Sequence, residues 1–280
     1  MAISIQTNIA SLIAQQNLQV NNDFANRTVQ RLTSGYRINS SGDDAAGLVI
    51  ANTYRSGVAE LSQGVRNAND GLSTLQIIDG GLNNISNILD RLKTLATESA
   101  SDTLQDDAAG TKRASLDKEF QALLTEIDRQ ADNIGLGATG QANLKQISVY
   151  IGGGSSAANS AVTVDLSNAG VDQTSLTLNG MKVDNTTDAS ASLAAISNAV
   201  ANLGSSQGAI GTGENDLNYA IQLAQSQITG YSAAESRLRD ADMAAEAANL
   251  TKVQVLQQAS IAAMAQANSA PQAVLSLLKG

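Results

Sequence analysis

The feature of the sequence that most limits its fold is a seven-residue repeat of apolar side chains between residues 68 and 96. One position of the repeat holds Ala68, Leu75, Leu82, Leu89 and Ala96, and a second position holds Ile78, Ile85 and Leu92. Two apolar positions in every seven residues place a narrow stripe along a helix, and such a stripe packs against a second helix. The repeat therefore predicts a long helix in a slender helical bundle.

Two later segments carry the same kind of stripe. The shorter one contains Leu116, Phe120, Leu123, Ile127 and Ile134, and the longer one extends from Leu193 to Leu238. Three stripes predict a slender helical bundle in the middle of the chain, and we expect a mainly α fold. We expect the coiled-coil core to contain Leu75, Ile78, Leu82, Ile85, Leu89, Leu92, Leu193, Ile196, Val200, Leu203, Leu217, Ile221 and Ile228.

The positions of proline and glycine decide how long these helices can be. The only proline is Pro271, near the C-terminus, and a proline inside a helix costs about 3 kcal/mol. Glycines at positions 204, 208, 211 and 213 lie inside the third stripe, and each costs about 1 kcal/mol relative to alanine. Because the seven-residue register continues through them, we predict one helix there, with a loop as the alternative.

Between residues 147 and 188 the pattern changes to alternation of apolar and polar residues. The alternating apolar residues are Ile147, Val149 and Ile151, then Val162, Val164 and Leu166, then Leu176 and Leu178. A two-residue period predicts β-strands, and Gly152-Gly153-Gly154 and Asn179-Gly180 are turn sequences. We predict a small β-hairpin insert that is not a domain of its own.

Composition argues against several functional classes. The 280 residues include no Cys and no His, which removes thiol chemistry, disulfides, most transition-metal sites and the usual imidazole base. A net charge of −9 without a basic patch argues against nucleic-acid binding. No stretch approaches the roughly 20 apolar residues of a membrane span, and the N-terminus has no signal-peptide pattern. We expect no catalytic residue, cofactor or metal.

The two ends of the chain, residues 1–34 and 243–278, carry spaced apolar residues among Asn, Gln and Ser, which is typical of amphipathic helices. A single stripe cannot be buried without a facing surface, and ordering such a segment costs more conformational entropy than its stripe returns. We therefore expect each end to fold only against the other end and against neighbouring copies. The C-terminal packing residues are Leu250, Val253, Leu256, Ile261, Met264, Leu275 and Leu278.

Two polar features between residues 35 and 47 admit a functional and a structural interpretation. Asp43 and Asp44 could form a carboxylate pair for acid–base chemistry, but no base, metal ligand or pocket accompanies them, and acidic residues suit a helix N-terminus. Gly35, Gly42 and Gly47 have neither the spacing of a P-loop nor that of a dinucleotide-binding loop. We favour the structural interpretation for both: a helix cap and a flexible connection.

Several long segments resemble one known family. Residues 34–51 read SGYRINSSGDDAAGLVIA, which resembles the signature between the first two helices of bacterial flagellins. The start, ISIQTNIASLIAQQNL, the segment NANDGLSTLQIIDGGLNNISNILDRLKTLA and the C-terminal segment SRLRDADMAAEAANLTKVQVLQQASIAAMAQANSAPQAVLSLL are similar to the family as well. The resemblance covers residues 1–134 and 200–278, and the stretch from Leu203 to Arg237 is about one heptad longer than the family pattern.

The resemblance implies an organisation for the whole chain. Both termini would form the D0 coiled coil, as residues 1–42 and 239–280, with a spoke at 43–56. The residues expected to contact other subunits in and next to the spoke are Arg37, Asn39, Asp43 and Asp44. Residues 57–146 and 189–238 would form the D1 bundle, and residues 147–188 would be a short variable β insert in place of large outer domains.

The resemblance also implies a function and partners. The chain would be a non-enzymatic subunit that leaves the cell through the flagellar export channel and polymerises with its own copies into an extracellular filament. Its partners would be an export chaperone on the C-terminal helix, the filament cap and the hook-associated junction proteins. Arg91, Leu95 and Glu119 lie off the apolar stripes, at expected outward positions, and match the flagellin surface that Toll-like receptor 5 detects.

Three other classes of protein could share parts of this sequence pattern. A hook-filament junction protein shares the terminal helices, and it would occur in only a few copies at the filament base. A cytosolic coiled-coil scaffold would stay inside the cell. A zinc protease, which some flagellins carry in their variable region, requires His ligands that this sequence does not contain.

Overall fold

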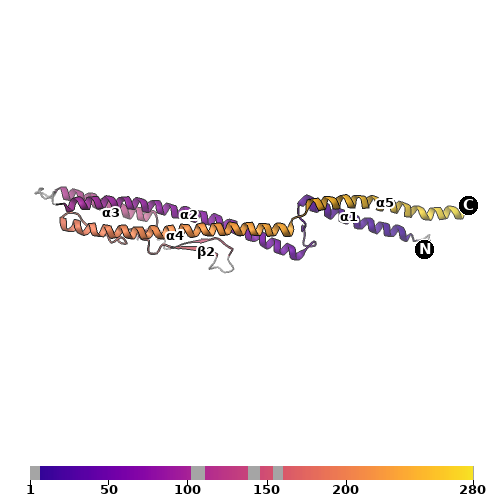
Figure 1. The fold of residues 1–280 in the computed structure, drawn as a ribbon, viewed down its shortest axis with the longest axis horizontal. Coiled ribbons are helices and arrows are strands. Elements are labelled where there is room, and N and C mark those ends of the chain that lie inside the picture. Colours follow the sequence, from indigo (N-terminus) through magenta and orange to yellow (C-terminus); the bar gives the residue numbers. More distant parts are fainter. Residues whose placement is uncertain (1–6, 102–110, 138–145, 154–159, 280) are drawn as a thin grey trace. The chain divides into compact units, whose positions relative to one another are not determined.

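The computed structural model describes residues 7–101, 111–137, 146–153 and 160–279, without the side chains of Thr111 and of residues 270–279. Its elements are α1 (Ile9–Ser34), α2 (Ala45–Ala100), α3 (Thr111–Asn133), β1 (Gln146–Tyr150), β2 (Ala161–Asp165), α4 (Thr186–Arg239) and α5 (Met243–Lys279) (Figure 1). The predicted mainly α fold with one small hairpin is confirmed. Two compact units are present: a terminal unit (residues 1–56 and 230–280) and a central unit (residues 57–229).

In the central unit, α2 packs along α4 and α3. The Gln207 amide of α4 donates to Asn83 Oδ1 of α2 at 3.2 Å, and Gly71 of α2 lies beside Leu217, so the two helices run antiparallel. The core face of α2 keeps the seven-residue repeat from residue 61 to residue 99. Its fully buried side chains include Leu61, Leu75, Ile78, Leu82, Ile85, Leu89 and Leu92.

The core face of α4 differs from the predicted one at every second position. Ile196, Leu203 and Leu217 are buried as expected, but Val200 is 39% exposed, and Leu193, Ile221 and Ile228 are only half-buried. The second buried row instead consists of small residues, Ser192, Ala199, Ser206 and Gly213. The prediction of Val200 in the core was wrong because it followed side-chain size, whereas the helix turns a row of small side chains inward.

Glycine does not interrupt α4, which is one continuous helix from Thr186 to Arg239. A Cβ at Gly204, Gly208 or Gly211 would meet nothing within 4 Å, so these residues lie on an open face of the helix. A Cβ at Gly213 would instead lie 2.5 Å from a methyl carbon of Val164 in β2. The helix interpretation of this stretch is therefore confirmed, and Gly213 is a contact point for the hairpin.

Strands β1 and β2 pair antiparallel, with Gln146 opposite Asp165 and Tyr150 opposite Ala161. The hairpin lies on glycine positions of the helices, since a Cβ at Gly64 would lie 1.7 Å from the carbonyl oxygen of Ile151. Asn67 of α2 also donates to the carbonyl of Tyr150 at 3.0 Å. Small residues on the helix surface thus let the strand backbone approach closely.

The third predicted strand is absent from the described part of the insert. Leu176 and Leu178 lie in turns, and both are fully buried. The Asp128 carboxylate of α3 accepts from both the backbone and the side-chain amide of Gln173 at 2.8 Å, which holds this segment against the bundle. A buried turn segment produced the same apolar alternation as a strand, while the Asn179-Gly180 turn is confirmed by a φ of +76° at Gly180.

Candidate assembly surface on the terminal helices

Helix α1 begins and ends at residues whose side chains or backbone suit a helix terminus. Asn8 precedes the helix, and its Oδ1 accepts from the backbone N–H of Ser11 at 3.1 Å, as an N-cap does. At the other end Gly35 adopts a φ of +75° and donates its N–H to the Arg31 carbonyl at 2.8 Å. A left-handed glycine at this place terminates the helix without steric cost.

Helices α1 and α5 lie side by side and antiparallel, with a seam that is mostly small and polar. Asn21 donates to Ser260 Oγ at 3.0 Å, and Arg31 forms an ion pair with Glu246 at 3.3 Å. Among the described side chains of the pair, the buried ones are Ala14, Thr28, Val253 and Glu246. In the described residues the second oxygen of Glu246 has no hydrogen-bond partner, although Glu246 is only 8% exposed.

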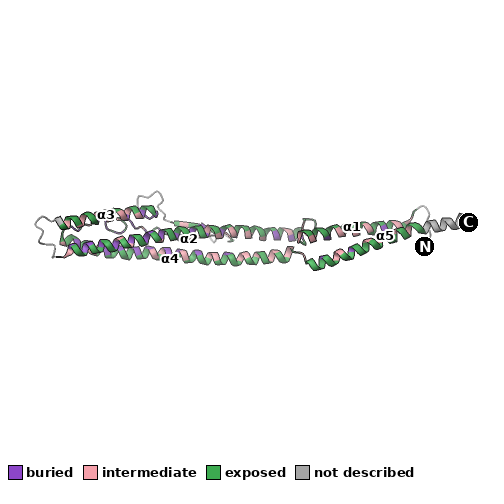
Figure 2. Ribbon diagram, turned by 90° about the horizontal axis from the view of Figure 1, so that it is seen from above, coloured by how far each residue is buried: buried purple, intermediate pink, exposed green. Residues whose placement is uncertain are grey.

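Many large apolar side chains of the pair are exposed and face away from this seam, whereas Val253 is buried in it. Leu12 is 63% exposed, and Figure 2 shows α1 and α5 largely in the exposed and intermediate colours. Exposed apolar residues follow both helices: Ile9, Leu12, Ile13, Val20 and Val29 on α1, and Met243, Val255, Leu256 and Ile261 on α5. An exposed apolar row of this length marks an interaction surface.

A short clasp joins the chain segments that follow α1 and precede α5. Arg37 donates its backbone N–H to the Arg239 carbonyl at 2.6 Å, and Ala241 donates to the Gly35 carbonyl at 2.9 Å. The Arg239 guanidinium lies 4.1 Å from the centre of the Tyr36 ring. The clasp therefore holds the base of the α1–α5 pair with backbone hydrogen bonds and a cation–π contact.

The four predicted spoke residues make contacts within the chain. Arg37 also donates a side-chain N–H to the Leu238 carbonyl at 2.9 Å. Asp43 Oδ2 accepts from the backbone N–H groups of Ser40 at 3.0 Å and Asn39 at 3.2 Å, and these bonds lower the pKa of the Asp43 carboxyl. Asp44 Oδ1 accepts from the Gly47 N–H at 2.8 Å and caps α2, which confirms the structural interpretation of Asp44.

The predicted packing residues of α5 divide between the seam and the open face. Val253 is buried, and Leu250 and Met264 are half-buried at the seam side. Leu256 and Ile261 are exposed on the apolar face. Leu275 and Leu278 have side chains outside the described ones. Sequence reasoning missed the polar seam, although Asn21 and Thr28 already show the seven-residue spacing that could have revealed it.

The predicted receptor surface in the central unit needs a correction. The guanidinium of Arg91 donates to Glu119 Oε1 from two nitrogens, at 2.9 and 2.6 Å, and both side chains are about half exposed. Leu95, expected at an outward position, is only 1% exposed. Because α2 packs against both α3 and α4, its buried face is wider than one stripe, and Leu95 lies within it.

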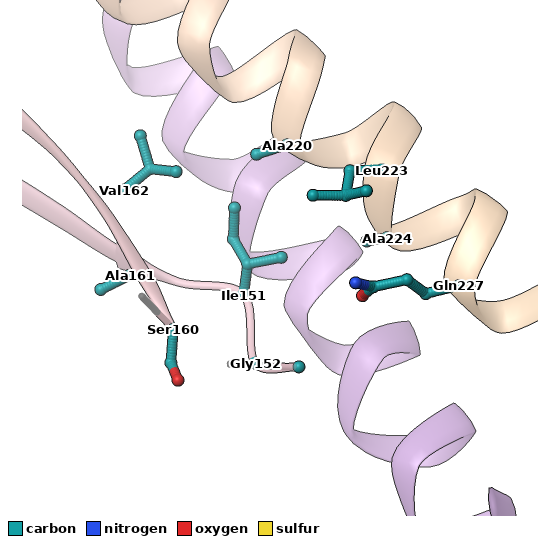
Figure 3. Close-up of a pocket in the computed structure, with 10 residues that line it drawn as sticks. Ile151, Gly152, Ser160, Ala161, Val162, Ala220, Leu223, Ala224 and Gln227 are labelled. Carbon is teal, nitrogen blue, oxygen red and sulfur yellow. The ribbon is translucent and has the colours of Figure 1, made fainter. Parts of the chain in front are cut away.

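A shallow groove lies beside the hairpin in the central unit. It lies between the β1–β2 end and α4, with a volume of about 320 Å³, and Figure 3 shows Ile151, Val162 and Leu223 around it. Ser160 and Gln227 are its polar side chains, and Leu223 is 60% exposed. None of the residues lining the groove carries a carboxylate, an amine or another side chain suited to acid–base chemistry.

Within the described residues, none of the helices combines the length and apolar character that a membrane crossing requires. The same part of the chain holds no group of three or more acidic residues placed to bind a metal ion. The exposed apolar rows on α1 and α5 are the candidate surface considered next.

Comparison with known proteins agrees with this arrangement. The bacterial flagellin N-terminal helical region matches residues 5–135, and the bacterial flagellin C-terminal helical region matches residues 193–278. A flagellin of Halalkalibacterium halodurans is 34% identical over 98% of this chain and 99% of its own length. Flagellins of Listeria monocytogenes and Bacillus subtilis are 34% and 31% identical, over 99% and 98% of this chain and 99% of their own lengths. Because both end regions match and these relatives align over almost their whole length, the chain belongs to the bacterial flagellin family, the structural subunits of flagellar filaments.

Proposed function

We propose that copies of this chain are exported and polymerise into an extracellular flagellar filament through the outward apolar faces of α1 and α5. The observation that carries this proposal is the arrangement of the terminal pair: small and polar residues meet in the seam, whereas Leu12, Ile13 and Ile261 face outward. Covering such side chains returns roughly 1.5–3 kcal/mol for each one that is fully buried. A filament of packed copies supplies that cover along the whole length of both helices.

The proposal includes the division of the chain that the resemblance implied. Residues 1–42 and 239–280 act as the filament-lining D0 pair, 43–56 as the spoke, 57–146 and 189–238 as D1, and 147–188 as the variable insert. The seam and clasp contacts within the terminal unit support the pairing of the two ends. Exposed Arg37 and Asp43 support a contact between spokes of neighbouring copies, beyond their hydrogen bonds inside the chain.

Polymerisation of the purified chain tests the proposal directly. We expect filaments under polymerising conditions, and we expect Ile13→Ser to raise the critical concentration about tenfold or more, because an apolar contact between copies is lost. Gln19→Ser on an exposed polar position of the same helix is the matched control and should polymerise like the parent. If Ile13→Ser polymerised at the parent's concentration, the apolar faces would not be the contact surface.

The export chaperone is proposed to cover α5 before assembly. Val255, Leu256 and Ile261 support this, because they leave an apolar row on a helix of a chain that must stay unpolymerised until export. A chain truncated after Leu250 should neither bind the chaperone nor polymerise. Polymerisation of the truncated chain would contradict the proposal. The filament cap and junction proteins are proposed as further partners at the two ends of the filament.

Recognition by Toll-like receptor 5 is proposed for the surface around the Arg91–Glu119 pair. Hydrogen bonds between Arg91 of α2 and Glu119 of α3 orient these two exposed side chains, and a receptor can bind an ion pair that is oriented in this way. Arg91→Glu places two carboxylates together and should reduce receptor signalling by free chains. The doubly exchanged variant, Arg91→Glu with Glu119→Arg, separates loss of the pair from loss of the surface charge pattern.

A further inference from the structure

Pro271, the only proline of the chain, lies inside helix α5 (Met243–Lys279). In an α-helix each backbone N–H donates to the carbonyl four residues earlier. A proline has no N–H, so the carbonyl of Ala267 loses its donor within the helix. The Ala267 carbonyl in the interior of α5 is therefore available to accept a hydrogen bond from another group.

The side chain that meets this carbonyl comes from the other end of the chain. Asn8 Nδ2 donates to the Ala267 carbonyl oxygen at 2.7 Å in a partly buried contact. The other half of the same amide, Oδ1, caps α1 by accepting from the Ser11 N–H. Asn8 therefore ties the first turn of α1 to one particular residue of α5.

The rest of the seam places weak limits on how far one helix can slide along the other. Small side chains such as Ala14 and Thr28 can pack in either of two registers that differ by one heptad, so polar groups contribute to the choice between them. After such a shift Asn21 would leave Ser260 and face an apolar residue. Asn8 would meet a carbonyl that already accepts a helical hydrogen bond.

We propose that Asn8 and Pro271 form a register lock, in which the proline frees the Ala267 carbonyl and Asn8 binds it, so that α1 and α5 pair in one alignment. The contact lies within one chain, and its use rests on the proposed filament role, since alignment brings the outward apolar rows of both helices level. Asn21–Ser260 and Arg31–Glu246 support the same alignment farther along the pair.

A double-mutant cycle on the full-length chain tests the lock. Asn8→Asp keeps an acceptor for the α1 cap and removes the amide donor, whereas Pro271→Ala gives the Ala267 carbonyl a helical donor again. Hydrogen exchange is measured for peptides from α1 and from residues 260–270. The sample is the polymer or the soluble chain, according to which of the two protects the α1 amides from exchange. Asn8→Asp should speed exchange roughly three- to tenfold with Pro271 present, as for a net hydrogen bond, and less than twofold with alanine there.

Asn21→Asp is the matched control, because it removes a seam donor whose acceptor does not depend on the proline. Its effect should be the same in both backgrounds. An Asn8→Asp effect that is equal with proline and with alanine would overturn the lock, and so would the absence of an effect with proline.

Disulfide trapping measures the register itself, since the chain has no cysteine of its own. Asn8–Ala267 and Asn21–Ser260 place Ser11 near Met264, so Ser11→Cys with Met264→Cys should close in the native register. Ser11→Cys with Gln257→Cys closes only after a shift of one heptad. Asn8→Asp should lower the native product and raise the shifted one, and an unchanged pattern would overturn the register role. Hydrogen exchange and disulfide trapping both report on the α1–α5 pair within one chain. Failure of the parent chain to polymerise would therefore contradict the filament proposal and not the lock.

Discussion

The central and terminal units use the same heptad spacing with opposite chemistry in the seam. In the central unit the seam of α2 is built from fully buried Leu and Ile side chains such as Leu82 and Ile85. In the terminal unit the seam of α1 and α5 contains Ala14, Asn21 and Thr28 beside Val253, while large apolar residues such as Leu12 and Ile261 face outward. Figure 2 shows the difference as a row of buried residues in one unit and few in the other.

The comparison shows how one chain combines a self-sufficient part with a part that depends on other copies. Burial of apolar area is the main favourable term in folding, so the central unit has its driving force inside its own seam. The terminal unit keeps that driving force on its outer surface, where only other molecules can use it. Polar contacts in its seam then provide alignment more than stability.

The largest expected effect is a core truncation in the central unit. Leu82→Ala should lower the free energy of unfolding of the soluble chain by about 2–5 kcal/mol, because Leu82 is fully buried and leaves a cavity. Urea denaturation followed by circular dichroism measures it. Leu12→Ala in the terminal unit is the matched control, and it should leave the soluble chain's transition unchanged. A similar loss from both variants would remove the contrast between the units.

The second effect concerns the close approach of the hairpin to α2. Gly64→Ala should destabilise the central unit by about 1–3 kcal/mol, because the new methyl group would overlap the Ile151 carbonyl and backbone has to move. Gly80→Ala on the open face of the same helix should stabilise it by about 0.5–1 kcal/mol. Thermal unfolding of both variants checks the difference in sign, and two stabilised variants would show that the hairpin does not depend on Gly64.

A smaller gain is expected where the insert contains backbone strain. Thr177 has a φ of +58°, which is unfavourable for a β-branched residue. Thr177→Gly should therefore stabilise the central unit by about 1 kcal/mol, as measured by thermal unfolding. Thr177→Ala removes the hydroxyl but keeps the Cβ, so it should give none of this gain. Equal midpoints for the glycine and alanine variants would show that the turn is not strained.

The smallest effect is a pH dependence in the terminal unit. Hydrogen bonds from the Ser40 and Asn39 N–H groups lower the pKa of Asp43 below its usual value of 3.8, so the folded turn favours the ionised carboxylate. That contribution is present above the unfolded pKa and is lost as the pH falls through the folded pKa. The protection of the amides of residues 39–44, expressed relative to their intrinsic exchange rate at each pH, should therefore fall below about pH 4, as measured by mass spectrometry. Asp43→Asn should remove this dependence, and an unchanged profile in that variant would assign it to another group.

Prediction from sequence succeeded where one periodicity had one structural meaning. The repeat from Leu75 to Leu92 corresponds to a buried face of one helix, and the glycines of α4 did not alter its helical path. It was wrong at Val200 and Leu95, where two adjacent residues could each face inward. Ala199 is buried in place of Val200, whereas Leu95 and Ala96 are both buried, and the packing partners of each helix decide these outcomes.

For the candidate site, the sequence showed that both ends carry spaced apolar residues, but it did not show which face of each helix meets the other helix. Ile9, Leu12 and Val20 are visible in the sequence as a stripe, and we expected the opposite end of the chain to cover part of it. The structure turns Asn21 and Ala14 toward α5 instead. Hydrogen bonds between residues more than 200 positions apart, such as Asn21 and Ser260, fix that direction, and in the sequence the seven-residue spacing of Asn21 and Thr28 is a weak sign of it.

The amino-acid sequence alone determined the long helices, their heptad seams, the absence of thiol and imidazole chemistry, and the flagellin resemblance, because these follow from local spacing and composition. Only the tertiary structure decided that Ala199 is buried where Val200 was expected, and that Leu176 and Leu178 lie in buried turns. It also decided that Asn8 binds the carbonyl of Ala267, one helical turn before Pro271. The physical reason is that side-chain burial and hydrogen-bond partners depend on what packs from the other side, and the facing segment lies far away in the chain.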